Sequence, residues 1–157
     1  MSGIRLFVMD VDGTLTDGRI YIGPGGEVMK AFDVKDGYGI KALMKCGVVP
    51  VIITGRESAI VAARCRELGV EELYQGVADK LGCMMEVAHK YGVEAQQIAY
   101  IGDDVNDLAC MQYAGVSACP ADAWEQVKDS AAYICRNNGG RGAVREFADL
   151  LLKNDRF

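Results

Sequence analysis

The chain of 157 residues contains one histidine, three prolines and no apolar run near the ~20 residues that a membrane-spanning helix requires. The longest apolar runs, such as Val48 to Ile53, are far shorter, which excludes a membrane-embedded protein. Because His89 is the only histidine, a catalytic base or a zinc site built from imidazoles is also unsupported. His89 falls in an expected helix and is predicted to lie on its surface. The available chemistry is therefore that of carboxylates, hydroxyls, lysine and arginine.

An excess of basic residues is also lacking. The sequence has 17 Lys and Arg against 22 Asp and Glu, which gives a net charge of −5. Such a chain has no cationic surface to hold a nucleic-acid backbone or an anionic membrane, so we expect neither as a partner. The first residues show no basic-then-apolar signal pattern, and we expect the protein to stay in the cytoplasm.

Disulfide and zinc motifs are missing despite six cysteines. No two of them form a C-x-x-C pair, and they are scattered along the chain, so a disulfide framework or a zinc site is not indicated. Most fall in apolar helix or strand patterns, where a free cysteine acts as a small hydrophobic residue. Unpaired thiols in a reducing cytoplasm are the simplest expectation.

Short apolar runs alternate with amphipathic segments along the whole chain. With 50% hydrophobic residues and this length, we predict one domain over residues 1–157. Alternation of this kind predicts an α/β fold, a doubly wound (Rossmann-like) parallel sheet covered by helices on both faces. Strands are expected at 4–9, 48–53, 73–75, 98–101, 116–118 and 133–134, and helices at 36–45, 58–68, 80–91, 106–113 and after 143. Asp36 is predicted to cap the first helix.

An inserted β-hairpin is predicted at about residues 18–33. Gly23-Pro24-Gly25-Gly26 forms the turn, and apolar residues flank it, among them Ile20, Ile22, Val28 and Phe32. An isolated hairpin is marginally stable, and exposed apolar strands are normally covered. Pairing with other copies of the chain would cover it; a plain surface flap is the alternative.

Three of the expected strands end in polar clusters: Asp10-Val11-Asp12, Thr54-Gly55-Arg56 and Gly102-Asp103-Asp104. Ligands of such folds bind at the carboxyl ends of the strands. One acidic residue there is explained by helix capping, but three polar clusters on one edge predict an acidic cleft. Carboxylates brought together need a cation, and oxygen-only ligands favour Mg²⁺, which completes its shell with a phosphate.

A carboxylate is the best nucleophile available at this edge, because the sequence has no recognisable serine or cysteine nucleophile motif. Asp10 or Asp12 must fill that role. Two carboxylates two residues apart permit a division of labour, in which one attacks phosphorus and the other moves protons. Lys80, the Thr54 hydroxyl and the backbone at Gly13, Gly55 and Gly102 supply groups for phosphate oxygens.

The four motifs resemble, in order and over nearly the whole chain, the haloacid dehalogenase (HAD) phosphatases. They are Asp10-Val11-Asp12-Gly13-Thr14-Leu15-Thr16, Thr54-Gly55-Arg56, Lys80 and Gly102-Asp103-Asp104-Val105-Asn106-Asp107. The resemblance implies a HAD-like fold in which Asp10 forms an aspartyl-phosphate and Asp12 is the general acid/base. It assigns Thr54, Gly55 and Lys80 to phosphate, and Asp10, Asp103 and the Asp12 carbonyl to Mg²⁺. It gives Asp104 and Asp107 a role in orienting Lys80 or metal waters; for Asp107, a plain acidic residue in a helix's first turn is an equal alternative.

No cap domain fits between the motifs, because a hairpin, two helices and two strands already occupy those segments. The cap-free chain, with its early hairpin and two further segments, resembles the 3-deoxy-D-manno-octulosonate (Kdo) 8-phosphate phosphatases. The segments are Thr54-Gly55-Arg56-Glu57-Ser58 and Gly139-Gly140-Arg141-Gly142-Ala143-Val144-Arg145-Glu146. The resemblance implies hydrolysis of an acidic sugar phosphate by a homotetramer built through the hairpin. Arg56 suits the substrate carboxylate. Arg141 is expected to reach phosphate or sugar, in its own or a neighbour's site, or else to lie in a helix-entry loop.

Other functions remain as alternatives. A phosphatase for a nine-carbon keto acid 9-phosphate (KDN or N-acetylneuraminate) is near, although Arg56 stands where those enzymes tend to carry Glu. A catalytically silent tetramerisation domain is disfavoured by intact Asp10, Asp12, Lys80 and Asp103. A phosphomutase normally needs a cap, and a signalling receiver domain carries its phosphorylated aspartate after the third strand.

Overall fold

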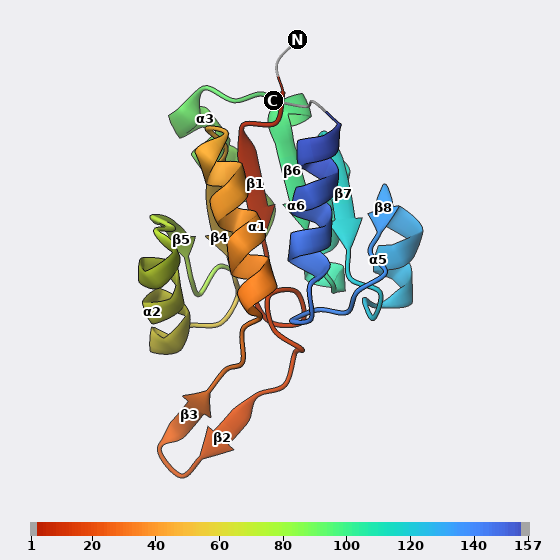
Figure 1. Ribbon diagram of the computed structural model, residues 1–157. Helices are drawn as coiled ribbons and strands as arrows, with labels where there is room; N and C mark the ends of the chain where they lie inside the picture. Colours follow the sequence, from red (N-terminus) through yellow and green to blue (C-terminus); the bar gives the residue numbers. More distant parts are fainter. Residues whose placement is uncertain (1–2, 155–157) are drawn as a thin grey trace.

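The computed structural model describes residues 3–154 and contains a six-stranded parallel sheet with helices on both faces (Figure 1). The strand order is β5-β4-β1-β6-β7-β8, and a separate two-stranded sheet pairs β2 with β3. The strands are β1 (Leu6–Met9), β2 (Tyr21–Gly23), β3 (Gly26–Met29), β4 (Val49–Ile53), β5 (Glu72–Tyr74), β6 (Ile98–Ile101), β7 (Val116–Cys119) and β8 (Tyr133–Ile134). The α-helices are α1 (Val34–Lys45), α2 (Ala59–Leu68), α3 (Lys80–Tyr91), α4 (Leu108–Tyr113), α5 (Glu125–Ser130) and α6 (Ala143–Lys153), with 3₁₀ turns at Ala95–Gln97 and Val105–Asp107.

Both faces of the sheet are buried, which explains why the central strands are continuously apolar. Successive side chains of a strand point to opposite faces. On β1, Phe7 and Met9 pack with α1, α2 and α6, whereas Leu6 and Val8 pack with α3, α4 and α5. The predicted doubly wound α/β fold is confirmed.

The register of β1 brings the polar clusters to one edge. Met9 lies opposite Ile52 of β4 and Ile101 of β6. Each of these three strands ends at or within one residue of this level, so the segments that follow, beginning at Asp10, Thr54 and Gly102, emerge side by side. The catalytic candidates of the sequence therefore share one sheet edge.

The predicted cap of the first helix was wrong. Asp33, not Asp36, is the N-cap of α1, and its carboxylate accepts a hydrogen bond from the Lys35 amide at 2.7 Å. Asp36 instead lies buried in the first turn, where its Oδ1 accepts a hydrogen bond from the Arg145 amide at 2.9 Å and joins α1 to α6. Burial raises the pKa of Asp36 to about 6, with the charge of Asp33 adding to the effect.

Two further expectations need correction. The helix expected at 106–113 is divided into a 3₁₀ turn, Val105–Asp107, and the short helix α4. Helix α5 was not predicted; it has six residues and no side-chain hydrogen bond at its N-cap, so the usual start signal is absent. The other helices and strands lie within about two residues of their predicted positions, and α3, β6 and β8 match them.

The hairpin formed by β2 and β3 extends away from the layered body (Figure 1). Apolar side chains on it are exposed: Ile20 37%, Ile22 72%, Val28 60% and Met29 52%. In the described part of the chain no cap domain covers the sheet edge, as expected. Helices long and apolar enough to cross a membrane are likewise not found among residues 3–154.

Candidate active site

A buried ammonium group lies at the centre of the site. Lys80, the first residue of α3, is 3% exposed, and its Nζ donates hydrogen bonds of 2.8 Å to Asp10 Oδ1 and to Asp107 Oδ1. Burial opposes the charged form of Lys80, but the two carboxylates outweigh it and raise the Lys80 pKa above its ordinary value. The lysine therefore stays cationic and links β1, α3 and the segment after β6.

Asp107 is fully buried and receives every hydrogen bond that its carboxylate needs. Oδ1 accepts from Lys80 and from the Tyr100 hydroxyl at 2.6 Å, while Oδ2 accepts from the Asp103 and Asp104 amides at 3.0 and 3.2 Å. These bonds curl residues 103–107 into a tight turn, to which Asp104 contributes by capping the Val105 amide at 2.7 Å. Asp107 holds both Lys80 and the loop that carries Asp103.

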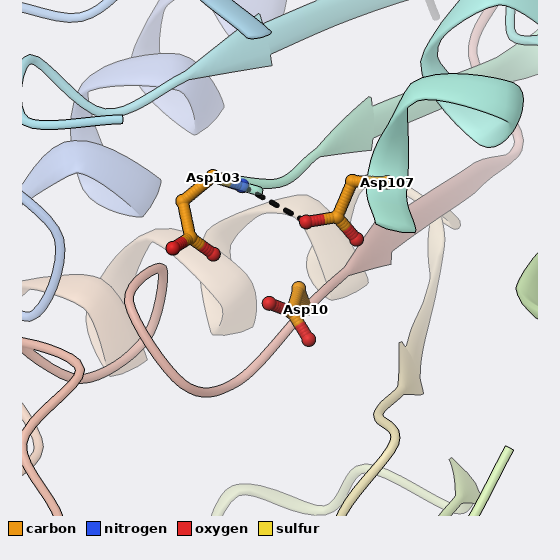
Figure 2. Close-up of side chains that lie close together, drawn as sticks. All are labelled: Asp10, Asp103 and Asp107. Atoms are coloured by element: carbon orange, nitrogen blue, oxygen red, sulfur yellow. Dashed lines mark hydrogen bonds between the residues drawn. The ribbon is translucent and has the colours of Figure 1, made fainter. Parts of the chain in front are cut away.

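Three carboxylates converge at this point, as Figure 2 shows. Oxygen atoms of Asp10, Asp103 and Asp107 lie within 4.8 Å of one another. Burial and the charge of Asp107 raise the Asp10 pKa to about 6, although Lys80 opposes this. Burial and the charge of Asp10 raise the Asp103 pKa to about 9. One ammonium does not neutralise three carboxylates, so the donor set fits a divalent cation with oxygen ligands.

Gly13 is required by the close approach of Asp103. It has a φ of +88°, and a Cβ at this position would lie 2.0 Å from Asp103 Oδ2. The next residue, Thr14, donates its hydroxyl to Asp103 Oδ1 at 3.0 Å. The turn after β1 therefore positions Asp103 as well as Asp10 and Asp12.

A depression of about 180 Å³ opens over the strand ends. It is lined by Asp10, Asp12, Thr54, Gly55, Arg56, Asp104 and Asn106. Thr54 is 2% exposed and directly follows β4, while the Arg56 side chain is 47% exposed at the rim. The structure thus brings together every site residue expected from sequence except Arg141. Those that do not line the depression are Lys80, Asp103 and Asp107, which are linked by hydrogen bonds to one another and, through Lys80, to Asp10.

Arg141 lies elsewhere in the single chain. It lines a separate depression of about 490 Å³ beside α6, whose wall also contains Lys35, Arg136, Arg145 and Lys153. The loop that carries Arg141 nevertheless contacts the turn after β1, because the Gly140 amide donates a hydrogen bond to the Thr14 carbonyl at 3.0 Å. Arg141 does not join the wall of its own chain's Asp10 depression.

No role was predicted from the sequence for four side chains that contact the site: Thr14, Lys30, Tyr100 and Asn106. Tyr100 could have been identified from the sequence, because it is the one residue with a polar side-chain group in the buried strand Ile98-Ala99-Tyr100-Ile101. Lys30 gave no such signal, since it follows the hairpin strand and reaches Asp12 only through the tertiary fold; its Nζ lies 2.6 Å from Asp12 Oδ1.

The family model of the haloacid dehalogenase-like hydrolases matches residues 69–147, which include Lys80, Asp103 and Asp107. Kdo 8-phosphate phosphatase KdsC of Escherichia coli (strain K12) is 46% identical over 151 residues, which cover 96% of this chain and 80% of that protein. The chain belongs to the haloacid dehalogenase-like hydrolases.

Solved structures resemble this hydrolase over almost its whole length. The Kdo 8-phosphate phosphatase of Moraxella catarrhalis, in complex with magnesium ion, phosphate ion and a KDO molecule, is 45% identical with a TM-score of 0.93. The cobalt-bound phosphatase of Haemophilus influenzae is 38% identical, also with a TM-score of 0.93. Both alignments cover 96% of this chain, and they cover 86% and 88% of the other chains, respectively.

We expect Mg²⁺ to stabilise this hydrolase more at pH 8.5 than at pH 6. The raised pKa values of Asp10 and Asp103 mean that the metal-free fold loses stability as pH rises from about 4 towards 9, and a metal must displace the Asp103 proton. At saturating Mg²⁺ the gain at pH 8.5 should be about 1–3 kcal/mol, measured by thermal unfolding with and without EDTA.

Asp103→Asn provides the internal check. This variant removes a carboxyl group that must retain its proton in the metal-free fold but ionises in the unfolded chain, so it should be more stable than the wild type without metal at pH 8.5 and should lose the Mg²⁺ response. Asp129→Asn, a change at an exposed residue of α5, should behave like the wild type. A Mg²⁺ effect that survives in Asp103→Asn would contradict the assignment of the metal site.

Proposed function

We propose that this chain is a Mg²⁺-dependent phosphomonoesterase that hydrolyses 3-deoxy-D-manno-octulosonate 8-phosphate to Kdo and phosphate. One observation carries the proposal. The Asp10–Lys80–Asp107 centre, with Asp12 and Asp103 beside it, is complete in a chain that is 46% identical to a phosphatase named for that substrate. A silent assembly domain would have no need to keep two buried carboxylates bonded to one buried lysine, with a third carboxylate beside them.

The first chemical step uses the two carboxylates that follow β1. An oxygen of Asp10 attacks phosphorus, and the bond between phosphorus and the sugar oxygen breaks with its electron pair left on that oxygen. The sugar oxygen takes a proton from Asp12 and leaves as an alcohol, so that Asp10 holds the phosphoryl group. Asp10 is 6% exposed, so water competes poorly for the nucleophilic oxygen.

The second step reverses the role of Asp12. Its carboxylate takes a proton from water, and the water oxygen attacks phosphorus. The bond to Asp10 then breaks, which releases inorganic phosphate and restores both carboxyl groups to their starting forms. Lys80, Thr54 and the Gly55 backbone bind phosphoryl oxygens, and Lys80 remains protonated because Asp10 and Asp107 face it.

Magnesium, when bound, offsets the negative charge of the phosphoryl group and of the carboxylates. Asp10, Asp103 and the backbone carbonyl of Asp12 would hold it, and Thr14 and Gly13 keep Asp103 in reach. Asp107 serves Lys80 and the loop amides, and Asp104 shapes the same loop, so both act on the site by orienting other groups.

Substrate choice is assigned to Arg56 at the rim of the depression. A guanidinium binds a carboxylate through two parallel hydrogen bonds, and the half-exposed Arg56 is free to do so because its contact with Glu27 is long, 3.8 Å. This favours a keto-acid sugar phosphate over a neutral one. A nine-carbon 9-phosphate also carries the carboxylate, so it is the second substrate to test. Arg141 is proposed to approach a neighbouring copy's site, since it does not line its own.

Assembly through the hairpin is part of the proposal. The exposed residues Ile22 and Val28 lie on an extension that the body of the chain does not cover, and pairing of hairpins in a homotetramer would bury them. The cytoplasm is the proposed location, because all six cysteines are free and four are buried.

Replacing the nucleophile should abolish activity. Asp10→Asn is expected to reduce phosphate release from Kdo 8-phosphate by more than about 10³-fold, because Asp10 is the carboxylate assigned to form the acyl phosphate and an amide does not replace it as a nucleophile. Phosphate release is measured with Mg²⁺ on Kdo 8-phosphate, N-acetylneuraminate 9-phosphate, glucose 6-phosphate and p-nitrophenyl phosphate, with Asp129→Asn as the matched control. Wild-type turnover by Asp10→Asn would rule out the covalent mechanism, and a higher kcat/KM on the 9-phosphate would reassign only the substrate.

Arg56→Ala should separate acidic from neutral substrates. Loss of a charge-assisted contact of about 1.5–3 kcal/mol predicts a ten- to hundredfold drop in kcat/KM on Kdo 8-phosphate. On p-nitrophenyl phosphate, which has no carboxylate, the change should stay within about threefold. Arg66→Ala, at an exposed arginine of α2, controls for loss of surface charge. Equal losses on both substrates would remove Arg56 from carboxylate recognition.

Charges placed on the hairpin should dissociate the assembly. The double variant Ile22→Asp, Val28→Asp is expected to sediment as a smaller species than the wild type, because buried carboxylates would oppose hairpin pairing. Sedimentation velocity measures the change, and Met85→Asp, at an exposed residue of α3, is the control. A wild type that sediments as a monomer would refute the assembly outright.

A further inference from the structure

Lys30 is an almost fully buried lysine outside the set of groups used above. It directly follows β3 on the hairpin, and its side chain is 1% exposed. The Nζ atom donates to Asp12 Oδ1 at 2.6 Å. Removing an ammonium from water is costly, so a lysine in this position needs compensating partners, and Asp12 is the nearer of its two.

The second partner fixes Lys30 from the other side. Glu27, also on β3, has Oε2 3.3 Å from Lys30 Nζ, and its Oε1 accepts the Ser58 hydroxyl at 2.5 Å. Ser58 is the N-cap of α2 and follows closely on Thr54 and Arg56. The Ser58 hydrogen bond and Lys30 lower the Glu27 pKa, so Glu27 stays anionic. Lys30 is thus held between two carboxylates and attached to the body of the protein.

Attachment of the hairpin to the body of the protein does not by itself explain why Lys30 contacts Asp12. The contact between Glu27 and Ser58 already attaches the hairpin to α2, and it needs no lysine in contact with Asp12. Among the residues that the structure describes, Lys30 is the one hydrogen-bond donor to the Asp12 carboxylate. The Asp12 side chain is 20% exposed and lines the depression, so without Lys30 it would be free to rotate.

We propose that Lys30 is a positioning residue for Asp12. By holding Oδ1, it directs Oδ2 toward the depression, where the sugar oxygen and later the water molecule must exchange a proton. A general acid/base acts efficiently only when it is held within hydrogen-bond reach of that oxygen. Lys30 itself touches neither substrate nor the reacting atoms. This inference rests on the proposed function, in which Asp12 transfers the protons.

The test is a double-mutant cycle of Lys30→Gln and Asp12→Asn, assayed on Kdo 8-phosphate. Lys30→Gln alone should lower kcat about tenfold or more with KM within about threefold, because it impairs proton transfer and not binding. In the Asp12→Asn background the same change should have almost no further effect, since Lys30 acts only through Asp12. Lys30→Arg should recover part of kcat, and Lys41→Gln, at an exposed lysine of α1, should match the wild type.

A leaving group that needs no proton gives a second readout. With p-nitrophenyl phosphate, the burst of nitrophenolate reports the first step, and Lys30→Gln should slow that burst less than threefold. Equal slowing of the burst and of Kdo 8-phosphate turnover, additive effects in the cycle, or a change confined to KM would overturn the proposal. A wild type that releases phosphate from none of these substrates overturns the proposed function itself, and with it the role of Lys30; an active wild type with an additive cycle overturns the role of Lys30 alone.

Discussion

The ammonium of Lys80, buried between Asp10 and Asp107, is the interaction on which the rest of the site depends. It lets two carboxylates lie at the carboxyl ends of β1 and β6 without unfolding the edge of the sheet, because each is bonded to a cation and Asp107 is saturated by further donors. With Asp103 added, the acidic groups outnumber the one ammonium that can neutralise them. The site therefore has an excess of negative charge, which a divalent cation would offset together with the charge of a phosphoryl group, and this lets an acidic chain accommodate an anionic substrate.

The sheet determines where the turns after its strands lie, and the turns carry the reactive side chains. Parallel strands of matched register bring Asp10, Thr54 and Gly102 to the same level, and the residue types in the turns then decide what meets there. Gly13 removes the steric barrier between two turns, and the hairpin places Lys30 on the far side of Asp12. The hairpin thus combines an exposed apolar surface with a buried contact to a proposed catalytic group.

The sequence was sufficient to predict the layered fold and the edge of the sheet where the site lies, because both follow from local periodicity and from strands that end in polar residues. Tyr100 could have been found, because it is the one residue with a polar side-chain group in a buried apolar strand. Lys30 and Thr14 could not be predicted, since their partners Asp12 and Asp103 are 18 and 89 residues away and no local pattern marks such contacts. The cap of α1 failed for a related reason. Asp33 and Asp36 are both acceptable caps by residue type, and the contact of Asp36 with Arg145 of α6 decides between them. Arg141 shows the same limit, because a loop's sequence does not reveal which depression its side chain enters.

The contact between the loop before α6 and the turn after β1 links the two ends of the described chain. Gly139 packs so closely on the Gly13 carbonyl that a Cβ would lie 1.9 Å from it, and the Gly140 amide donates to the Thr14 carbonyl. The turn that bears Asp12 is therefore shaped by residues that a ribosome adds more than a hundred positions later. A chain that ends before residues 139–140 therefore lacks the contacts that complete the backbone of this turn, however much of the sheet it already contains.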